Sequence, residues 1–173
     1  MHNYEAFETD RLILKPTDVE DAAFLIELFN SPKWLQFIGD RNVKTLESAK
    51  NYIRIKITSQ FDRLGFATYT LIRKSDYTKV GTIGLYDREG LEGIDIGFAL
   101  LPLFEGKGYA YEAAKILKYM AFNEFNLHQL KAITMKENFS AQKLLERLHM
   151  SFKGTIVLPN SYEQLMLYSL SKY

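Results

Sequence analysis

The sequence Ile94-Asp-Ile-Gly-Phe-Ala-Leu-Leu-Pro-Leu-Phe-Glu-Gly-Lys-Gly-Tyr-Ala-Tyr-Glu-Ala113 decides the fold. Its first seven residues are rich in β-branched and aromatic side chains and predict a strand, which Pro102 stops because proline has no N–H to donate. Gly106 and Gly108 then let main-chain N–H groups approach a ligand, and the following helix points its positive dipole end the same way. The stretch predicts an anion-binding loop with Lys107 on its rim, although ordinary strand-to-helix turns also use such glycines.

Outside this stretch, the hydrophobic period changes several times between the spacing of a helix and that of a strand. Asp18 and Thr45 are suitable N-caps for two helices that follow the first strand. The pattern predicts an α+β fold with a mixed sheet of about seven strands flanked by helices, in the order β-α-α-β-β-β-α-β-α-β-β. The expected strands are 11–16, 66–72, 80–86, 94–100, 130–135, 152–157 and 164–170, and the expected helices are 18–30, 45–61, 108–125 and 138–148.

Length and composition limit the function classes. The 173 residues are expected to form a single domain, 1–173, and the 22 basic and 21 acidic side chains give a net charge of +1, which disfavours nucleic acid and membrane surfaces as partners. The chain has no cysteine for a disulfide, a thiolate zinc site or a nucleophile, and its three histidines, His2, His128 and His149, lack metal-ligand spacing. Neither a signal peptide nor a long apolar run is present, so we expect a cytoplasmic protein without a metal.

The stretch from Ile94 to Ala113 closely resembles the GNAT superfamily of N-acetyltransferases, which place a strand, a proline and a glycine-rich pyrophosphate loop before a helix. The family loop, Gln/Arg-x-x-Gly-x-Gly/Ala, falls on Glu105, Gly106, Lys107, Gly108, Tyr109 and Ala110. Glu105 departs from the family residue and is expected to turn outward. The resemblance also implies that two parallel strands splay after a bulge, and that the backbone of Phe98, Ala99 and Leu100 binds the pantetheine arm of acetyl-CoA.

A second resemblance lies in residues 136–150, which are similar to the family helix Asn-x-x-Ser/Ala-x-x-Leu-x-x-x-x-Gly-Phe. It implies that Asn138 and Ser140 line the pantetheine arm and the thiol, although Asn138 is also an ordinary N-cap. Leu145 stands where many members have a tyrosine that protonates the departing thiolate. Residues 8–14, Glu-Thr-Asp-Arg-Leu-Ile-Leu, are similar to the Rim-type branch of ribosomal-protein N-terminal acetyltransferases.

The resemblance implies direct transfer of the acetyl group from acetyl-CoA to a primary amine, without a covalent enzyme intermediate. Asp95 is the first candidate for the general base, Asp87 and Glu92 are others, and a chain of water molecules could also serve. Asp95 could instead belong to the solvated face of an antiparallel sheet. Ser140 is the candidate to assist departure of the thiolate.

The acceptor is expected to be a protein N-terminus or a small-molecule amine, bound by a monomer or a homodimer. Trp34, Phe37, Asp40 and Arg41 form an aromatic and charged loop between the two N-terminal helices, which predicts one wall of the acceptor site. A lone tryptophan is more often a core residue. A catalytically silent acetyl-CoA sensor or interaction module is the alternative function, and a nucleotide-binding protein is a weaker one because no Walker or Rossmann context surrounds the glycines.

Overall fold

In the computed structural model, which describes residues 4–173, eight strands form one mixed sheet in the order β1-β2-β3-β4-β5-β6-β8-β7. His2 therefore lies outside the described residues. All neighbouring strands are antiparallel except β5 and β6, which are parallel. The strands are β1 (Phe7–Glu8), β2 (Leu12–Pro16), β3 (Thr68–Arg73), β4 (Lys79–Asp87), β5 (Ile94–Leu100), β6 (Gln129–Met135), β7 (Ser151–Ile156) and β8 (Leu165–Ser171).

The helices begin at the residues that offer caps. Asp18 and Thr45 both accept hydrogen bonds from the backbone of the turn that they start, which confirms them as caps. Gly65 ends the second helical segment in the left-handed conformation, at a φ of +83°. The helices are η1 (Val19–Asp21), α1 (Ala22–Phe29), α2 (Pro32–Phe37), α3 (Leu46–Tyr52), η2 (Ile53–Thr58, a π-helix), α4 (Ser59–Leu64), η3 (Pro102–Phe104), α5 (Tyr109–Asn123) and α6 (Phe139–Arg147).

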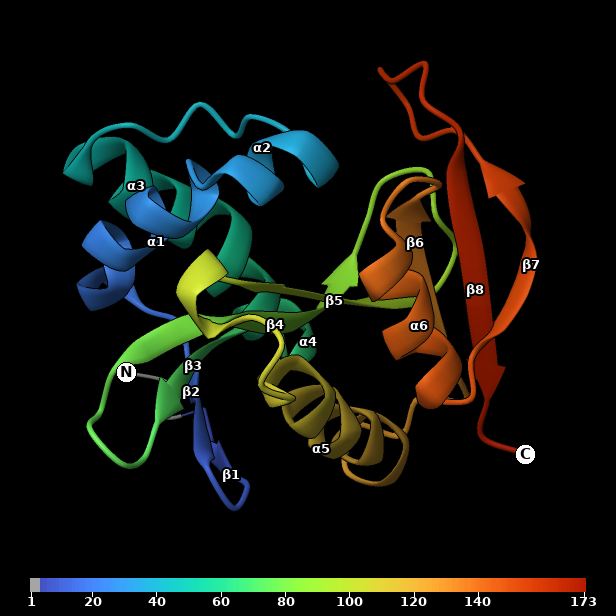
Figure 1. Cartoon of the computed structure of the whole chain (residues 1–173), viewed down its shortest axis with the longest axis horizontal. Coiled ribbons are helices and arrows are strands. Elements are labelled where there is room, and N and C mark those ends of the chain that lie inside the picture. Colours follow the sequence, from blue (N-terminus) through green and yellow to red (C-terminus); the bar gives the residue numbers. More distant parts are fainter. Residues whose placement is uncertain (1–3) are drawn as a thin grey trace.

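The helices form layers around a sheet that splits in its middle (Figure 1). Helices α1, α2 and α3 lie on one side of strands β2 to β5, and α5 lies on the other side. Helix α6 packs on β6, in the part of the sheet that also holds β8 and β7. The two parts of the sheet diverge between β5 and β6.

The divergence has a simple origin in the strand pairing. Strands β5 and β6 are paired only where Asp95 lies opposite Lys131, and beyond this point they separate. The expected bulge is absent from β5, because its register with β4 is unbroken from Gly81↔Leu100 to Asp87↔Ile94. Since no β6 partner follows Asp95, the backbone groups of Ile96–Leu100 that face β6 are not used by the sheet.

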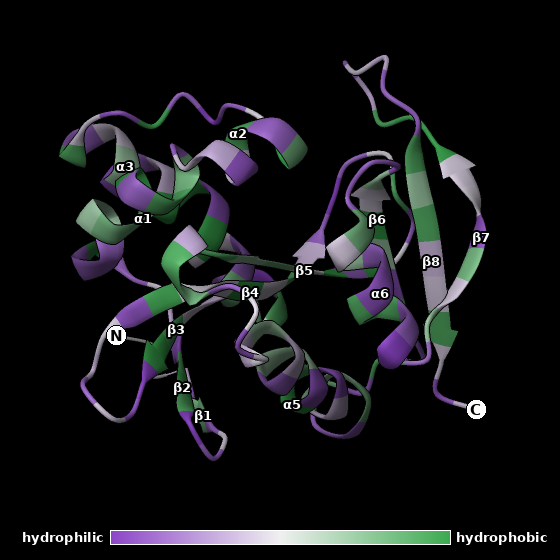
Figure 2. Cartoon of the chain, in the orientation of Figure 1, coloured by the Kyte–Doolittle hydropathy of each residue, from purple (hydrophilic) through white to green (hydrophobic). Residues whose placement is uncertain are grey.

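The hydrophobic core lies between the sheet and its helices, as alternating strand residues require. Leu71, Ile83 and Leu85 of the central strands are fully buried, as is Leu117 of α5. Figure 2 shows hydrophobic residues in strands such as β3 and β8, and hydrophilic residues in most connecting loops. Among residues 4–173, no helix combines the length and the apolar character that a membrane span would need.

The fold class is confirmed, with local differences from the expected elements. The sheet has eight strands rather than about seven, because the two-residue strand β1 adds an edge. The expected loop after residue 30 contains α2, which starts with Pro32 at its first turn. The expected helix 45–61 consists of three consecutive segments, of which the middle one is the π-helix η2. Single extra turns and two-residue strands lack the repeated apolar spacing on which sequence prediction depends.

Gln60 is a buried polar side chain that ties the helical layer to the sheet. Its Nε2 donates to the carbonyl oxygens of Phe66 (2.9 Å) and Leu85 (2.7 Å), and its Oε1 accepts from the Asp87 N–H (3.3 Å). Replacing Gln60 by Ala leaves these groups unsatisfied, so we expect the free energy of unfolding to fall by about 1–3 kcal/mol in urea titrations. Gln36→Ala, at an exposed position of α2, should change it by less than about 0.5 kcal/mol. Equal effects of the two changes would contradict this role of Gln60.

Candidate active site

The splayed strands border a cavity of about 940 Å³. Residues 96–100 of β5 line one wall, and residues 132–134 of β6 line the other. Helix α2, the start of α5 and one face of α6 along its whole length also contribute to the lining. The cavity is therefore continuous from the glycine-rich loop to the N-terminal helices, and its volume is that of a ligand-binding pocket.

The glycine-rich loop presents free backbone donors to this cavity. Gly106 and Gly108 adopt positive φ angles of +72° and +82°, a conformation that favours glycine. Steric exclusion of a side chain does not explain Gly106, because a Cβ there would meet no atom within 4 Å. The first helical hydrogen bond of α5 runs from Glu112 N–H to Gly108 O (3.0 Å), so the amides of Tyr109, Ala110 and Tyr111 have no helical acceptor. No side chain caps them. These donors, at the positive end of a 15-residue helix, can hold a phosphate group.

Arg11 fixes this loop against the N-terminal strands. Its Nη1 donates to the carbonyl oxygen of Lys107 (2.9 Å), its Nε donates to Glu112 Oε2 (2.7 Å), and its guanidinium lies 4.5 Å from the centre of the Tyr109 ring. Burial alone would raise the pKa of Glu112, but hydrogen bonds from Thr9 and Arg11 lower it, so the carboxylate stays charged. These contacts thus tie the loop and the first turn of α5 to the connection between β1 and β2.

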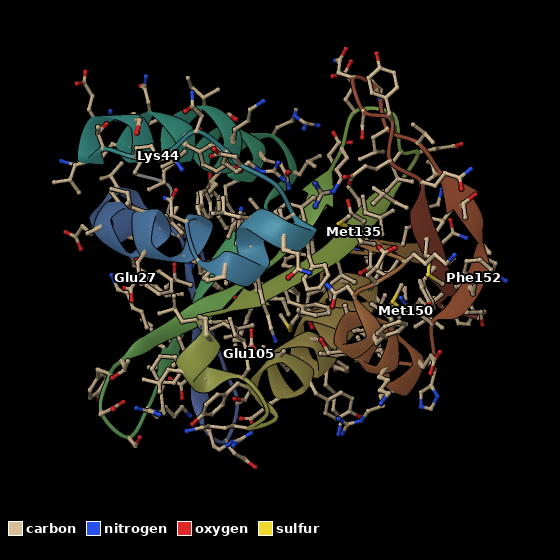
Figure 3. All side chains as sticks on the ribbon, turned by 45° about the horizontal axis from the view of Figure 1, so that its top comes forward. Glu27, Lys44, Glu105, Met135, Met150 and Phe152 are labelled. Carbon is tan, nitrogen blue, oxygen red and sulfur yellow. The ribbon has the colours of Figure 1, made fainter. Side chains whose placement is uncertain are left out.

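Glu105 does not turn outward as expected. It lines the cavity, and its carboxylate is paired with Lys33 of α2. Figure 3 marks Glu105 in the segment between β5 and α5. The ion pair neutralises the acidic charge next to the loop and links α2 to it. Lys107, expected on the rim, is exposed and does not line the cavity; its carbonyl rather than its ammonium takes part in the loop structure.

Asp95 lies at the point where β5 and β6 separate, and its side chain is only 1% exposed. Arg88, in the β4–β5 connection, donates from Nε to both carboxylate oxygens, at 2.9 and 3.0 Å. Burial raises the pKa of Asp95 to about 6, although Arg88 acts in the opposite direction. Burial alone would lower the pKa of Arg88, but Asp95 raises it, so the pair is ionised at neutral pH. Asp87 instead pairs with Arg63, and neither Asp87 nor Glu92 lines the cavity.

The Tyr86 ring lines the cavity beside the Arg88–Asp95 pair. Tyr86 lies opposite Asp95 in the β4–β5 register, and the Arg88 guanidinium lies 4.9 Å from the centre of its ring. A Cβ at Gly84 would lie 2.6 Å from Tyr86 Cζ, and one at Gly97 would lie 2.9 Å from Tyr86 Cε2. Only glycines leave room for the ring in this position.

The other predicted cofactor residues lie along the same cavity. Asn138 caps α6, with its Oδ1 accepting from the Ala141 N–H (3.3 Å), and it also lines the cavity, so both interpretations of this residue are compatible. Ser140 lies beside it and its hydroxyl donates to the same oxygen (3.3 Å). Leu145 lines the cavity with an apolar surface where many family members have tyrosine. The residues predicted to bind the cofactor that line the cavity are Phe98, Ala99, Leu100, Glu105, Gly106, Gly108, Tyr109, Ala110, Asn138 and Ser140.

The predicted acceptor wall is partly a helix. Trp34 and Phe37 belong to α2, and Arg41 follows it; all three line the cavity. Trp34 stacks on Phe29, with 4.2 Å between ring centres, so it is both a packing residue and a wall residue. Asp40 is exposed and outside the cavity, where its carboxylate accepts from Asn42 N–H (2.7 Å) and pairs with Lys44 (3.3 Å).

Several charged residues of the cavity were not predicted from the sequence. Lys33 meets Glu105 only through the fold, and Arg88 meets Asp95 across the β4–β5 hairpin, so no sequence motif identifies either pair. Arg147 of α6 lies over the Tyr111 ring of α5, with its Cζ 3.8 Å from the ring centre, and both residues line the cavity. Lys143 lies four residues before Arg147 and therefore on the same face of α6. This pair of basic residues at helical spacing is the one sequence pattern that could have indicated a basic surface in the cavity.

Comparison with known proteins agrees with this arrangement. The family model "Acetyltransferase (GNAT) domain" matches residues 11–151. The chain belongs to the GNAT acetyltransferase family. The N-acetyltransferase YnaD of Bacillus subtilis is 25% identical over 146 residues, which are 84% of this chain and 82% of that protein. Spermidine N(1)-acetyltransferase of Escherichia coli is 23% identical over 145 residues, or 83% of this chain and 75% of that protein.

Solved structures share the fold of this GNAT acetyltransferase over nearly its whole length. An acetyltransferase from Agrobacterium tumefaciens superposes with a TM-score of 0.82 and 22% identity, covering 99% of this chain and 97% of the other. RimL, a ribosomal-protein acetyltransferase in complex with coenzyme A, gives a TM-score of 0.73 and 16% identity, covering 96% and 98% of the two chains. Structural neighbours thus include Rim-type enzymes, which share the fold of this chain.

Proposed function

We propose that this GNAT acetyltransferase transfers the acetyl group of acetyl-CoA directly to a primary amine, without a covalent enzyme intermediate. One observation carries the proposal: a single cavity joins the unpaired donors of the glycine-rich loop, the free backbone edge of β5 and the buried Asp95 carboxylate. The similar proteins that act on spermidine or on ribosomal proteins support an amine as the acceptor, either on a small molecule or at a protein N-terminus.

The chain's residues fit acetyl-CoA along the whole cavity. Amides at the start of α5 would hold the pyrophosphate, and the backbone of residues 98–100, which β6 leaves unpaired, would bond the amides of the pantetheine arm. Asn138 and Ser140 would line the arm from the opposite side. Acetyl-CoA supplies an acetyl group activated as a thioester: its C–S bond breaks as the C–N bond forms, and coenzyme A leaves as a thiol.

Asp95 is the proposed general base. With its pKa raised by burial to about 6, it is ionised at neutral pH and remains basic enough to take a proton from the acceptor, directly or through water. Both carboxylate oxygens already accept from Arg88, but each keeps a lone pair for a further hydrogen bond. Arg88 thereby orients the base. Ser140 is the proposed group that assists departure of the thiol.

Ligand-induced stabilisation and acetyl-CoA consumption together test the proposal. At a concentration about 100 times its Kd, acetyl-CoA should raise Tm by roughly 5–10 °C, while ATP and NAD leave it unchanged. The same preparation should release free thiol from acetyl-CoA when amines are added, in a panel that includes peptides with different first residues. Stabilisation without thiol release for any amine would favour the silent sensor or interaction module, for which Leu145 in place of tyrosine is an argument.

A further inference from the structure

The charges that line the cavity are unequal, and their pairing leaves cations in excess. Only two acidic side chains line it, Asp95 and Glu105, and each is bonded to a cation, Arg88 and Lys33 respectively. Among residues 4–173, no acidic side chain of the lining is without a basic partner. The basic side chains of the lining are Lys33, Arg41, Arg88, Lys143 and Arg147.

Arg41 is the unpaired cation at the acceptor end, which we define as the part of the cavity lined by Trp34, Phe37, Arg41, Tyr52 and Arg88. Its side chain is half-buried, yet it makes no ion pair or hydrogen bond with any described residue. A guanidinium has five donors and is always charged, so a half-buried one without a partner favours an anionic ligand.

Arg88 supplies further donors at this end that lack acceptors. The hydrogen bonds of Arg88 use only its Nε, and its Nη2 lies 3.8 Å from the position that a Cβ on Gly97 would occupy, over the β5 floor. The Arg41 guanidinium and the Nη atoms of Arg88 are thus charged donors without acceptors, and they suit a carboxylate or carbonyl oxygen and repel a polycation.

We infer that the acceptor is an amine that carries a carboxylate, an amino-acid type of substrate, and that polyamines are poor acceptors. The inference rests on the proposed function, and it restricts the acceptor to amines that also carry a carboxylate. Arg41 and the free Nη atoms of Arg88 bind the carboxylate, which brings the amine toward Asp95. The rings of Trp34, Phe37 and Tyr52 in the same lining favour an apolar or aromatic side group on the acceptor.

Matched amines with and without a carboxylate test this inference. Phenylalanine and phenethylamine differ only in the carboxylate, and spermidine represents the polycations. We expect kcat/KM for phenylalanine to exceed that for phenethylamine by at least about tenfold, the effect of one charge-assisted hydrogen bond, and spermidine to be the poorest of the three. Equal values for the matched pair, or a preference for spermidine, would overturn the inference and leave amine acetylation itself intact.

Arg41→Gln isolates the carboxylate contact. It should raise KM for phenylalanine roughly tenfold, with KM for acetyl-CoA unchanged, and should reduce the preference over phenethylamine. The two amines differ in basicity, but this difference is the same for the native enzyme and for Arg41→Gln, so it does not affect the change in preference between them. Arg54→Gln removes an exposed arginine of η2 outside the cavity and serves as the matched control. If Arg41→Gln behaves like Arg54→Gln, the inference is wrong.

A binding measurement separates failure of the inference from failure of the proposed function. In the presence of coenzyme A, N-acetylphenylalanine should raise Tm more than N-acetylphenethylamine does, and Arg41→Gln should abolish the difference. No thiol release with any amine would contradict the proposed function. Equal stabilisation by the two acetylated compounds would contradict the carboxylate site, whether or not turnover occurs.

Discussion

Replacing Asp95 by Asn should lower kcat/KM roughly 100-fold or more and remove the acidic limb of the pH–rate profile. In the native enzyme the carboxylate form is the base, and burial raises the pKa of Asp95 to about 6. As the pH falls through about 6 the group becomes protonated, so the rate should fall by up to tenfold for each further pH unit. Asparagine cannot titrate, so the variant should show no such limb. Initial rates between pH 5 and 8 measure both effects.

Asp87→Asn is the matched control for this experiment. Asp87 lies in the same hairpin and is also paired with an arginine, Arg63, but it does not line the cavity. Its replacement should leave the rate and the pH profile unchanged. Because Asp95→Asn leaves Arg88 without its partner, acetyl-CoA must still raise the Tm of the variant for the result to report on chemistry. An Asp95→Asn enzyme that keeps the acidic limb would exclude Asp95 as the base.

Gly108→Ala should weaken acetyl-CoA binding by roughly tenfold or more. Gly108 has a φ of +82°, a conformation that costs a residue with a Cβ about 1–2 kcal/mol, and the new Cβ would lie 3.3 Å from Arg11 Nη2. Relief of the φ strain and of the close contact with Arg11 should rotate the backbone at the start of α5. This rotation would move the N–H groups of Tyr109 and Ala110 away from the position at which they bind the pyrophosphate. The Kd for acetyl-CoA, measured by calorimetry, reports the change directly.

Gly65→Ala separates backbone strain from loss of the anion site. Gly65 has a φ of +83°, nearly the same as that of Gly108, but it ends α4 and does not line the cavity. Both variants should lose a similar amount of stability, whereas only Gly108→Ala should lose affinity for acetyl-CoA. Similar Kd values for the two variants would show that the glycine-rich loop does not hold the pyrophosphate.

Much of the fold and part of the site could be predicted from local sequence. Strand β5 begins and ends at the predicted residues, Ile94 and Leu100. Its β-branched residues favour a strand, and Pro102 and the glycines of the following loop end it within a few residues. Asn138 and the loop glycines follow the same logic, since capping and positive φ are properties of single residues and their immediate neighbours.

Electrostatic partners could not be predicted, because they depend on how the chain folds around each charged side chain. Glu105 was expected to avoid the cavity on grounds of its charge alone, but Lys33, 72 positions earlier, neutralises it. Asp40 follows α2 closely in sequence, yet it bonds its own loop through Asn42 and Lys44 rather than facing the cavity. The short helix α2 (Pro32–Phe37) determines the direction in which the chain continues to Asp40. A helix of six residues is too short to show a hydrophobic period in the sequence.

The sequence by itself determined the strand–loop–helix unit from Ile94 to Ala113, with its backbone donors, because these follow from intrinsic conformational preferences of glycine, proline and β-branched residues. Only the tertiary structure decided where β5 and β6 separate, that Asp95 is buried against Arg88, and that Arg41 is left without a partner. Burial and charge pairing depend on which segments meet in space, and these two factors set the pKa of the base and the kind of acceptor that the cavity favours.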